Sequence, residues 1–236
     1  MTIFAAWQQL ASPQVTIAMA SMGFDWIVVD LEHSSITTQE AEAIFMAAER
    51  HNAKPFVRLP SADPYLARRL LDAGATGLFV PVIESREELD YFAQYCFFPP
   101  KGKRGLGLTR ANYWGKNLEE YFNEFKPTII AQIETKKGAE NIADIVSSGF
   151  LDGIMIGPYD LSASLGTPGQ FDNEAFKDIC ASVTVKAKNH KKMVGYHQVE
   201  PNAKMLQKCI KDRYDFIAYG TDIVALRHAL QDIKNE

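Results

Sequence analysis

Two apolar segments of this sequence each end on a carboxylic acid. Residues 128–134 read Thr-Ile-Ile-Ala-Gln-Ile-Glu and end at Glu134, and residues 153–160 read Gly-Ile-Met-Ile-Gly-Pro-Tyr-Asp and end at Asp160. Apolar runs of this length are typical of the buried strands of a parallel sheet. Because the carboxyl ends of parallel strands meet at one edge, where α/β enzymes carry out their chemistry, we expect the two acids to lie close together.

Two such carboxylates would suit a divalent cation. They leave coordination positions for water or substrate oxygens, which favours Mg²⁺, Mn²⁺ or Co²⁺ over a closed structural zinc site. The competing interpretation is that each acid only caps the helix after its strand, as Asp160 could do before Leu161–Leu165. A capping role is less expected for two acids in adjacent units than for one, so the sequence favours the metal site.

Other polar side chains follow the ends of neighbouring predicted strands. His33 comes after Asp30 and Glu32, two carboxylates that would favour a proton-carrying imidazole, although a solitary His at a loop start is more often a surface residue. Arg58 leaves a buried strand, and its guanidinium would suit a substrate carboxylate or a developing enolate oxygen. The alternative for Arg58 is a structural ion pair with Asp30 or Asp72.

The elements that would position these groups alternate along the whole chain. The predicted strands are Ile3–Trp7, Trp26–Leu31, Pro55–Leu59, Gly77–Pro81, Thr128–Glu134, Gly153–Ile156, Met193–His197 and Phe216–Tyr219. Amphipathic helical segments lie between them, at Thr38–His51, Pro64–Ala73, Arg86–Phe97, Ala139–Ser148, Glu174–Asn189 and Asn202–Lys211. About eight strand–helix units without a linker predict a single α/β domain over residues 1–236, folded as a (β/α)₈ (TIM) barrel in preference to an open doubly wound sheet.

The composition is that of an ordinary globular protein. Hydrophobic residues make up 47% and charged residues 23%, and the net charge of −4 leaves no electrostatic footprint for nucleic acid or an anionic membrane. Cys96, Cys180 and Cys209 lie far apart and match no zinc or redox spacing. With no export signal and no apolar run of membrane length, we expect reduced thiols and a cytoplasmic location.

Some reaction classes are disfavoured by what the strand ends lack. A Schiff-base aldolase needs a lysine at the catalytic end of a barrel strand, whereas Lys54, Lys191 and Lys192 precede their strands. The loops after the seventh and eighth predicted strands contain little glycine and an acid each, Glu200 and Asp222, which argues against a phosphorylated substrate. The sequence has neither a Gly-x-Gly-x-x-Gly fingerprint nor a P-loop, which argues against dinucleotide or ATP chemistry.

Six motifs, taken in order, give the chain a resemblance to a known family. They are Phe24–His33, Val57-Arg58, Leu71–Gly74, Pro99–Gly105, Gln132–Thr135 and Ile156–Ser162. Together they closely resemble the HpcH/HpaI family of metal-dependent (class II) pyruvate aldolases over nearly the whole chain. The resemblance implies a barrel of the phosphoenolpyruvate/pyruvate-binding type. It also implies reversible cleavage of a 4-hydroxy-2-oxoacid to pyruvate and an aldehyde through a metal-stabilised enolate.

The resemblance also implies roles for individual residues. The implied catalytic residues are His33, Arg58 and Asp72, the substrate-binding residues are Gln132, Pro158, Tyr159 and Arg58, and the metal ligands are Glu134 and Asp160. Arg58 would stabilise the enolate oxygen, and Gln132 would contact the bound oxoacid. His33, supported by Asp72 as a dyad, would handle protons at the aldehyde end, with a metal-bound water as the alternative base.

Assembly and the aldehyde partner are expectations of the same kind. Members of the family usually form hexamers, or trimers of dimers, and exchange their last helix between neighbours, which here would be Asp222–Lys234. We therefore expect a homo-oligomer that acts on small molecules. The polar run Tyr196-His197-Gln198 after the seventh strand indicates a hydroxylated aldehyde derived from a sugar acid.

Two other functions compete with the aldolase hypothesis. One is an acyl-CoA lyase of the citrate-lyase type, which would need a cationic surface for the CoA phosphates, and the candidates for it are Lys101, Lys103, Arg104 and Arg110. The other is a barrel that binds an oxoacid without turning it over. The presence of His33, Arg58, Glu134 and Asp160 together argues against a loss of chemistry.

Overall fold

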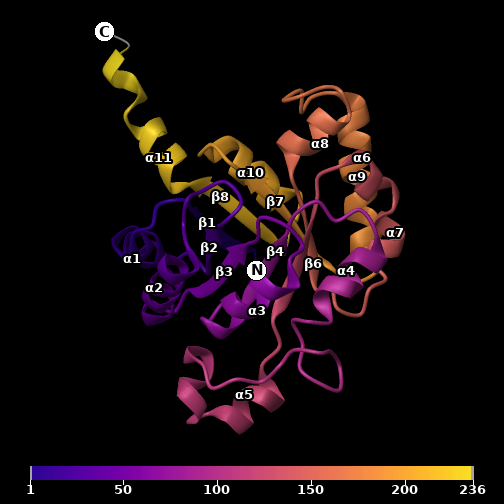
Figure 1. Cartoon of the computed structure of the whole chain (residues 1–236). Coiled ribbons are helices and arrows are strands. Elements are labelled where there is room, and N and C mark those ends of the chain that lie inside the picture. Colours follow the sequence, from indigo (N-terminus) through magenta and orange to yellow (C-terminus); the bar gives the residue numbers. More distant parts are fainter. Residues whose placement is uncertain (1, 235–236) are drawn as a thin grey trace.

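Eight parallel strands pair in sequence order and close into a barrel in the computed structural model, which describes residues 2–234 (Figure 1). They are β1 (Ile3–Gln8), β2 (Trp26–Asp30), β3 (Lys54–Arg58), β4 (Gly77–Val80), β5 (Thr128–Ile133), β6 (Gly153–Ile156), β7 (Met193–Gln198) and β8 (Phe216–Thr221). The barrel closes between β1 and β8, where the register shifts between Ala5 and Trp7. The predicted (β/α)₈ barrel is confirmed, and every strand lies within two residues of its predicted bounds.

Helices follow the strands and surround the barrel (Figure 1). They are α1 (Pro13–Ser21), α2 (Thr38–Arg50), α3 (Pro64–Asp72), α4 (Arg86–Ala93), α5 (Leu118–Glu124), α6 (Lys136–Glu140), α7 (Ile142–Ile145), α8 (Pro158–Ser164), α9 (Glu174–Asn189), α10 (Ala203–Lys211) and α11 (Asp222–Ala229), with 3₁₀ helices η1 (Arg110–Gly115) and η2 (Gln231–Lys234). Capping residues mark where they begin: Thr37 and Glu40 form a capping box ahead of α2, and Ser85 caps α4.

The helix predicted over Ala139–Ser148 is wrong in its bounds. The segment instead contains two short helices, α6 and α7, which meet at Asn141, the C-cap of the first and the N-cap of the second. Asn favours helix ends because its side chain competes for backbone hydrogen bonds. The helices α1, α5 and α8 were not predicted from the periodicity; α1 buries only Thr16 and Ala20, so it carries little amphipathic signal.

Large aromatic side chains fill the barrel interior near the amino ends of the strands, which we call its lower half. Trp26 stacks on Phe56 with ring centroids 4.2 Å apart, and Phe216 lies against Trp26 at 5.3 Å. Gly77 and Gly195 make room for these rings, since a Cβ at either position would come within 2.0 Å of an atom of Phe56 or Phe216 respectively. This packed layer supports the strands whose carboxyl ends carry the polar residues described below.

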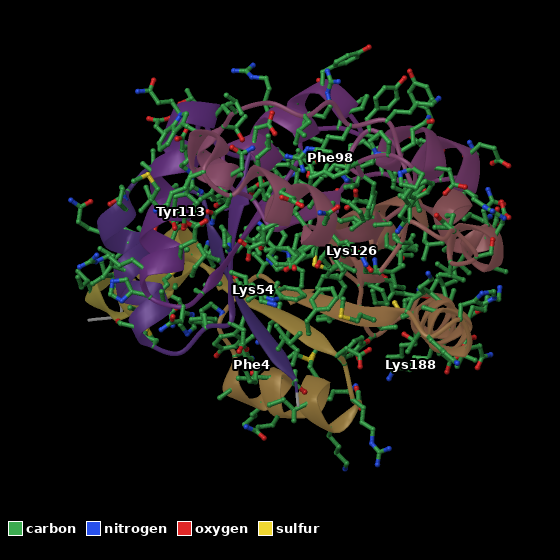
Figure 2. The ribbon with its side chains drawn as sticks, turned by 90° about the horizontal axis from the view of Figure 1, so that it is seen from below. Phe4, Lys54, Phe98, Tyr113, Lys126 and Lys188 are labelled. Carbon is green, nitrogen blue, oxygen red and sulfur yellow. The ribbon has the colours of Figure 1, made fainter. Side chains whose placement is uncertain are left out.

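The last helix, α11, buries none of its residues, as is also true of α5. The helix α11 projects away from the barrel (Figure 1), and Ile223, Leu226 and Leu230 on it are exposed. In the view from below, Lys188 at the end of α9 lies at the edge of the molecule (Figure 2). Among residues 2–234, no helix combines the length and the apolar character that crossing a membrane would require.

Candidate active site

The ends of several strands surround one cavity of about 330 Å³. It is lined by Trp7, Gln9, His33, Arg58, Gln132, Glu134, Met155, Gly157, Pro158, Tyr159, Asp160, His197, Val199, Thr221 and Val224. Of the catalytic, substrate-binding and metal-ligating residues implied by the family resemblance, the lining includes all but Asp72. The structure therefore brings the two acids, the arginine and the histidine of the sequence hypothesis into a single chamber.

The two acids follow adjacent strands and neither caps a helix. Glu134 comes directly after β5, while Asp160 lies in the first turn of α8, just after β6. The N-caps of the following helices are Thr135 and Gly157. Because a Cβ at Gly157 would lie 2.8 Å from Glu134 Oε2, glycine lets the β6–α8 turn approach the carboxylate closely.

Glu134 is buried and held in place by two hydrogen bonds. The backbone N–H of Val82 donates to its Oε1 at 2.7 Å, and Gln132 Nε2 donates to its Oε2 at 2.8 Å. Val82 has φ +52°, a left-handed conformation that β-branched residues rarely adopt. Backbone strain of this kind concentrates at functional sites, and here it aims an N–H at the candidate metal ligand.

Negative charge accumulates around Glu134. Burial raises the pKa of this carboxyl, and the nearby charges of Glu32 and Asp160 raise it further. The pKa of Glu32 is also raised, first by burial and then by the charges of Asp30 and Asp160. A cation in the cavity would relieve this repulsion.

Arg58 is held rigidly by two carboxylates. Its Nε and Nη2 donate to Asp30 Oδ1 and Oδ2 at 2.8 and 2.6 Å, and its Nη1 lies 3.0 Å from Glu32 Oε2. Burial alone would raise the pKa of Asp30, but the hydrogen bond and charge of Arg58 outweigh it and lower the pKa to about 2. The two interpretations of Arg58 are therefore compatible. Its ion pair with Asp30 fixes the guanidinium at the wall of the cavity.

The predicted dyad of His33 and Asp72 is not formed within this chain. His33 is exposed at the mouth of the cavity, with its backbone N–H donating to Asp30 Oδ1. Asp72, at the end of α3, is 2.7 Å from Arg104 Nη2 and lines a separate cavity. No hydrogen bond or ion pair within residues 2–234 joins it to His33. The physical reason is that Arg104, a buried cation, takes this carboxylate as its partner.

Several lining residues were missed by the sequence analysis. They are Trp7, Gln9, Met155, Val199, Thr221 and Val224, and His197 was noted only as part of a polar run. Trp7 and Thr221 stand at or near the ends of β1 and β8. The rule that polar and aromatic groups at strand ends face the site would have found them, had it been applied to the first and last strands.

Comparison with known proteins decides the family. A sequence model of the HpcH/HpaI aldolase/citrate lyase family matches residues 4–229. The chain belongs to this family. It is therefore a carbon–carbon lyase of the aldolase type.

Individual members of the HpcH/HpaI family are similar over nearly their whole length. The 5-keto-4-deoxy-D-glucarate aldolase of Salmonella paratyphi C is 32% identical over 231 residues, which are 96% of this chain and 89% of the relative. A family protein from Burkholderia cenocepacia has a solved structure with a TM-score of 0.90 and 27% identity, over 99% of this chain and 95% of the other. The solved structure of the HpcH/HpaI aldolase of Desulfitobacterium hafniense has a TM-score of 0.89 and 26% identity, over 99% of this chain and 92% of the other.

The donors in the cavity of this family member fit a divalent cation. The carboxylates of Glu134 and Asp160 line the same chamber, and Gln132 Oε1 is buried there without a hydrogen-bond partner among the described residues 2–234. Oxygen donors of this kind suit a hard cation such as Mg²⁺ or Mn²⁺. Within residues 2–234 no larger cluster of His, Cys, Asp and Glu side chains forms a metal site, so the fit rests on these two acids.

Proposed function

We propose that this lyase reversibly cleaves a 4-hydroxy-2-oxoacid to pyruvate and an aldehyde, with a divalent cation held by Glu134 and Asp160. The observation that carries the proposal is the convergence of these acids with Arg58, Gln132 and His33 on one cavity. When bound, the cation would supply Lewis-acid polarisation of the 2-oxoacid and charge stabilisation of its enolate.

Arg58 would stabilise the charge that develops on the keto oxygen. Three of the five N–H groups of a guanidinium are engaged here by Asp30 and Glu32, which leaves two free to face a substrate. The two carboxylates already hold the guanidinium in place, so it does not have to reorganise as negative charge develops on the keto oxygen of C2. Hydrogen-bond donors that are preorganised in this way contribute most to stabilising a transition state.

His33 would move the proton of the 4-hydroxyl group. Its exposed imidazole lies at the mouth of the cavity, where a departing aldehyde would pass. In the cleavage direction the imidazole takes the hydroxyl proton as the C3–C4 bond breaks, and in the synthetic direction it returns the proton to the aldehyde oxygen. The exposed Tyr159 and the buried Pro158 line the same cavity and would border the aldehyde.

We further propose that the aldehyde derives from a sugar acid. The curated relatives at 32% identity are named for 5-keto-4-deoxy-D-glucarate, and Gln9, Thr221 and His197 give this cavity polar walls. A comparison of retro-aldol rates on sugar-acid and unfunctionalised alkyl substrates tests this. Faster turnover of the alkyl series would contradict it.

The alternative of an acyl-CoA lyase finds no support at the cavity. None of its four candidate cations lines the chamber, and Arg104 and Arg110 are paired with Asp72 and Glu49 at 2.7 and 2.9 Å. Lys101 lies over the ring of Phe97. A phosphate-bearing cofactor would therefore meet cations that are already engaged or lie away from the site.

Assembly through the last helix forms part of the proposal. The helix α11 buries none of its own residues, and its apolar side chains Ile223, Leu226 and Leu230 are 42 to 56% exposed, which favours a partner of the same chain on this face. Light scattering of the wild type and of Leu226→Glu tests this. A monomeric wild type would contradict it. The cytoplasmic location also stays a prediction.

The direct test of the proposed function is proton exchange at C3 of pyruvate in D₂O. It reports enolate formation without knowledge of the aldehyde. We expect Mn²⁺ or Co²⁺ together with the protein to accelerate exchange well above either alone, and Glu134→Gln to remove the acceleration. Exchange that is no faster than with the metal alone would overturn the proposal and favour a barrel that only binds an oxoacid.

A further inference from the structure

A second cavity lies between the helices α9 and α10, on the side of β7 that faces away from the active site, and we call it the α9–α10 cavity. Its volume is about 640 Å³, against about 330 Å³ for the active-site cavity. Concave, mainly apolar cavities of about 300–1,000 Å³ are the usual form of a small-molecule site in proteins. None of the residues given a role in the proposed reaction lines it.

Two helix faces and one strand build the walls of the α9–α10 cavity. Each helix turns one face to it, with residues three or four positions apart. These residues include Phe176, Cys180 and Thr184 on α9, and Met205, Lys208 and Cys209 on α10. Successive side chains of a strand point to opposite faces, so Tyr196 on β7 lines this cavity while the next residue, His197, lines the active site.

The walls consist mainly of aromatic rings and sulfur atoms. The rings of Tyr196 and Tyr214 have centroids 5.5 Å apart, and a further ring pair, Phe171 and Phe176, lies at 5.7 Å. Aromatic rings pack well against the faces and edges of other rings, and the thioether of a methionine such as Met205 makes favourable contacts with ring edges. An aromatic molecule therefore matches these walls.

The charged side chains around the α9–α10 cavity are already paired with one another. Lys177 Nζ lies 3.2 Å from Asp172 Oδ1, and Lys208 Nζ lies 2.5 Å from Asp212 Oδ2. Burial raises the pKa of the Cys180 thiol to about 12, so this group adds no charge at physiological pH. A charged ligand would lose its hydration here without gaining a free ionic partner among the described lining residues, so the cavity favours an uncharged molecule.

One ring contact joins the α9–α10 cavity to the active site. Phe171, which lines the α9–α10 cavity, packs edge-on against Tyr159, with ring centroids 5.0 Å apart and an interplanar angle of 88°. Tyr159 lines the active-site cavity, where it would border the aldehyde. Because Phe171 is only half-buried, a ring bound beside it would add packing contacts and hold both side chains in place.

We propose that the α9–α10 cavity binds an uncharged aromatic molecule, which acts through Phe171 and Tyr159 as an effector of the active site. The rings of the walls enclose the aromatic part of the ligand. The hydroxyl of Tyr196, a residue that is 7% exposed, can donate a hydrogen bond to a polar group on it. The effector role rests on the proposed function, whereas the binding site does not.

Binding is tested with 6-propionyl-2-(dimethylamino)naphthalene, an uncharged aromatic probe whose carbonyl can accept from the Tyr196 hydroxyl and whose emission shifts to the blue in an apolar site. We expect saturable binding of a single probe per chain. Ala181→Trp, in the lining of the cavity, fills it and should abolish this binding. Ser182→Trp, on the next residue of α9 but outside the lining, is the matched control and should bind the probe like the wild type.

Tyr196→Phe removes only a hydroxyl and should weaken the probe by about two- to tenfold, which keeps the test valid if Ala181→Trp does not fold. Absence of saturable binding to the wild type, or equal binding to Ala181→Trp and Ser182→Trp, would show that the site is wrong. Binding to Leu226→Glu but not to the wild type would show that a second copy of the chain covers the cavity, which also overturns the proposal.

The preference for an uncharged ligand is tested by competition. The compounds 2-naphthol and 2-naphthoate share one ring system and differ in charge at neutral pH. We expect 2-naphthol to displace the probe at a concentration about tenfold lower or less, because the carboxylate finds no free cation. Equal displacement by the two compounds would contradict the assignment of an uncharged ligand.

The effector role is tested by kinetics with saturating 2-naphthol. We expect KM for cleavage of a sugar-acid 4-hydroxy-2-oxoacid to fall by about fivefold, while proton exchange of pyruvate, which has no aldehyde part, stays unchanged. The response should be absent in Ala181→Trp and present in Ser182→Trp. Binding without a change in KM would overturn the effector role. If the probe binds but pyruvate does not exchange, the proposed function fails and the aromatic site stands.

Discussion

The barrel interior is packed with aromatic side chains near the amino ends of the strands (the lower half) and lined with charged and polar side chains near their carboxyl ends (the upper half). In the lower half, Trp26 stacks on Phe56, and glycines on neighbouring strands leave room for the rings. Near the carboxyl ends (the upper half), a second tryptophan, Trp7, lies under the guanidinium of Arg58, and its N–H has no partner in the part of the chain that the structure describes. The lower half gains stability from packing. The upper half retains charge and unpaired polar atoms that a substrate can use.

The largest effect should follow a change in the upper half at the candidate metal ligand. Glu134→Gln keeps an oxygen that can accept from Val82 N–H but loses the negative charge, so we expect metal-dependent turnover to fall at least about 1000-fold while the fold is retained. Steady-state assays with and without excess Mn²⁺ measure this. Glu84→Gln, at the same end of the barrel but outside the cavity lining, is the matched control. If Glu134→Gln kept the turnover of the wild type after its metal had been removed with a chelator, the metal role would be refuted.

A change in the lower half should act on stability alone. Phe56→Ala removes a ring that is 1% exposed and stacked on Trp26, so we expect the free energy of unfolding to fall by about 3–5 kcal/mol. Denaturant titration measures the loss. Turnover of the folded fraction should stay within about twofold of wild type, and a selective loss of kcat would show that the two halves are not separable.

Arg58→Lys tests the upper half without removing its positive charge. A lysine cannot reproduce the bidentate contact with Asp30, so the donors that face the substrate lose their fixed direction. We expect kcat to fall by about 10²–10³-fold with little change in KM. Arg86→Lys on the surface serves as the control. An effect confined to KM would limit Arg58 to ground-state binding.

The smallest effect concerns the stability that the upper half does gain from Asp30. The pKa of Asp30 is lowered from 3.8 to about 2 in the folded chain. Its ionised carboxylate therefore adds to the free energy of unfolding above about pH 4, and this contribution is lost as the pH falls towards 2. The advantage of the wild type over Asp30→Asn in free energy of unfolding should therefore shrink by about 2 kcal/mol between pH 5 and pH 2. Denaturant titration at several pH values measures this. A constant difference would mean that Asp30 does not titrate in this range.

The sequence predicted the barrel well because local patterns determine its elements. Each strand is a short apolar run, and caps such as Thr37 and Asp63 mark where helices begin. The convergence of Glu134, Asp160 and Arg58 could also be predicted, since strand ends meet at one edge in any parallel barrel.

What the sequence could not show depends on long-range partners. The choice of Arg104 as partner for Asp72 is fixed by packing over 32 positions of the chain, and no local pattern indicates it. The same holds for Val82, whose left-handed backbone serves a glutamate 52 residues away. Whether Nε2 of His197 has a partner is likewise decided only once β1 and β7 are placed around the same cavity.

The most direct test of the account is where a cation binds. A crystal soaked with Mn²⁺ and pyruvate, measured for anomalous scattering, should show the metal coordinated by the carboxylates of both Glu134 and Asp160, with Arg58 facing the keto oxygen. A metal bound elsewhere, with the two acids uncoordinated and apart, would contradict the account.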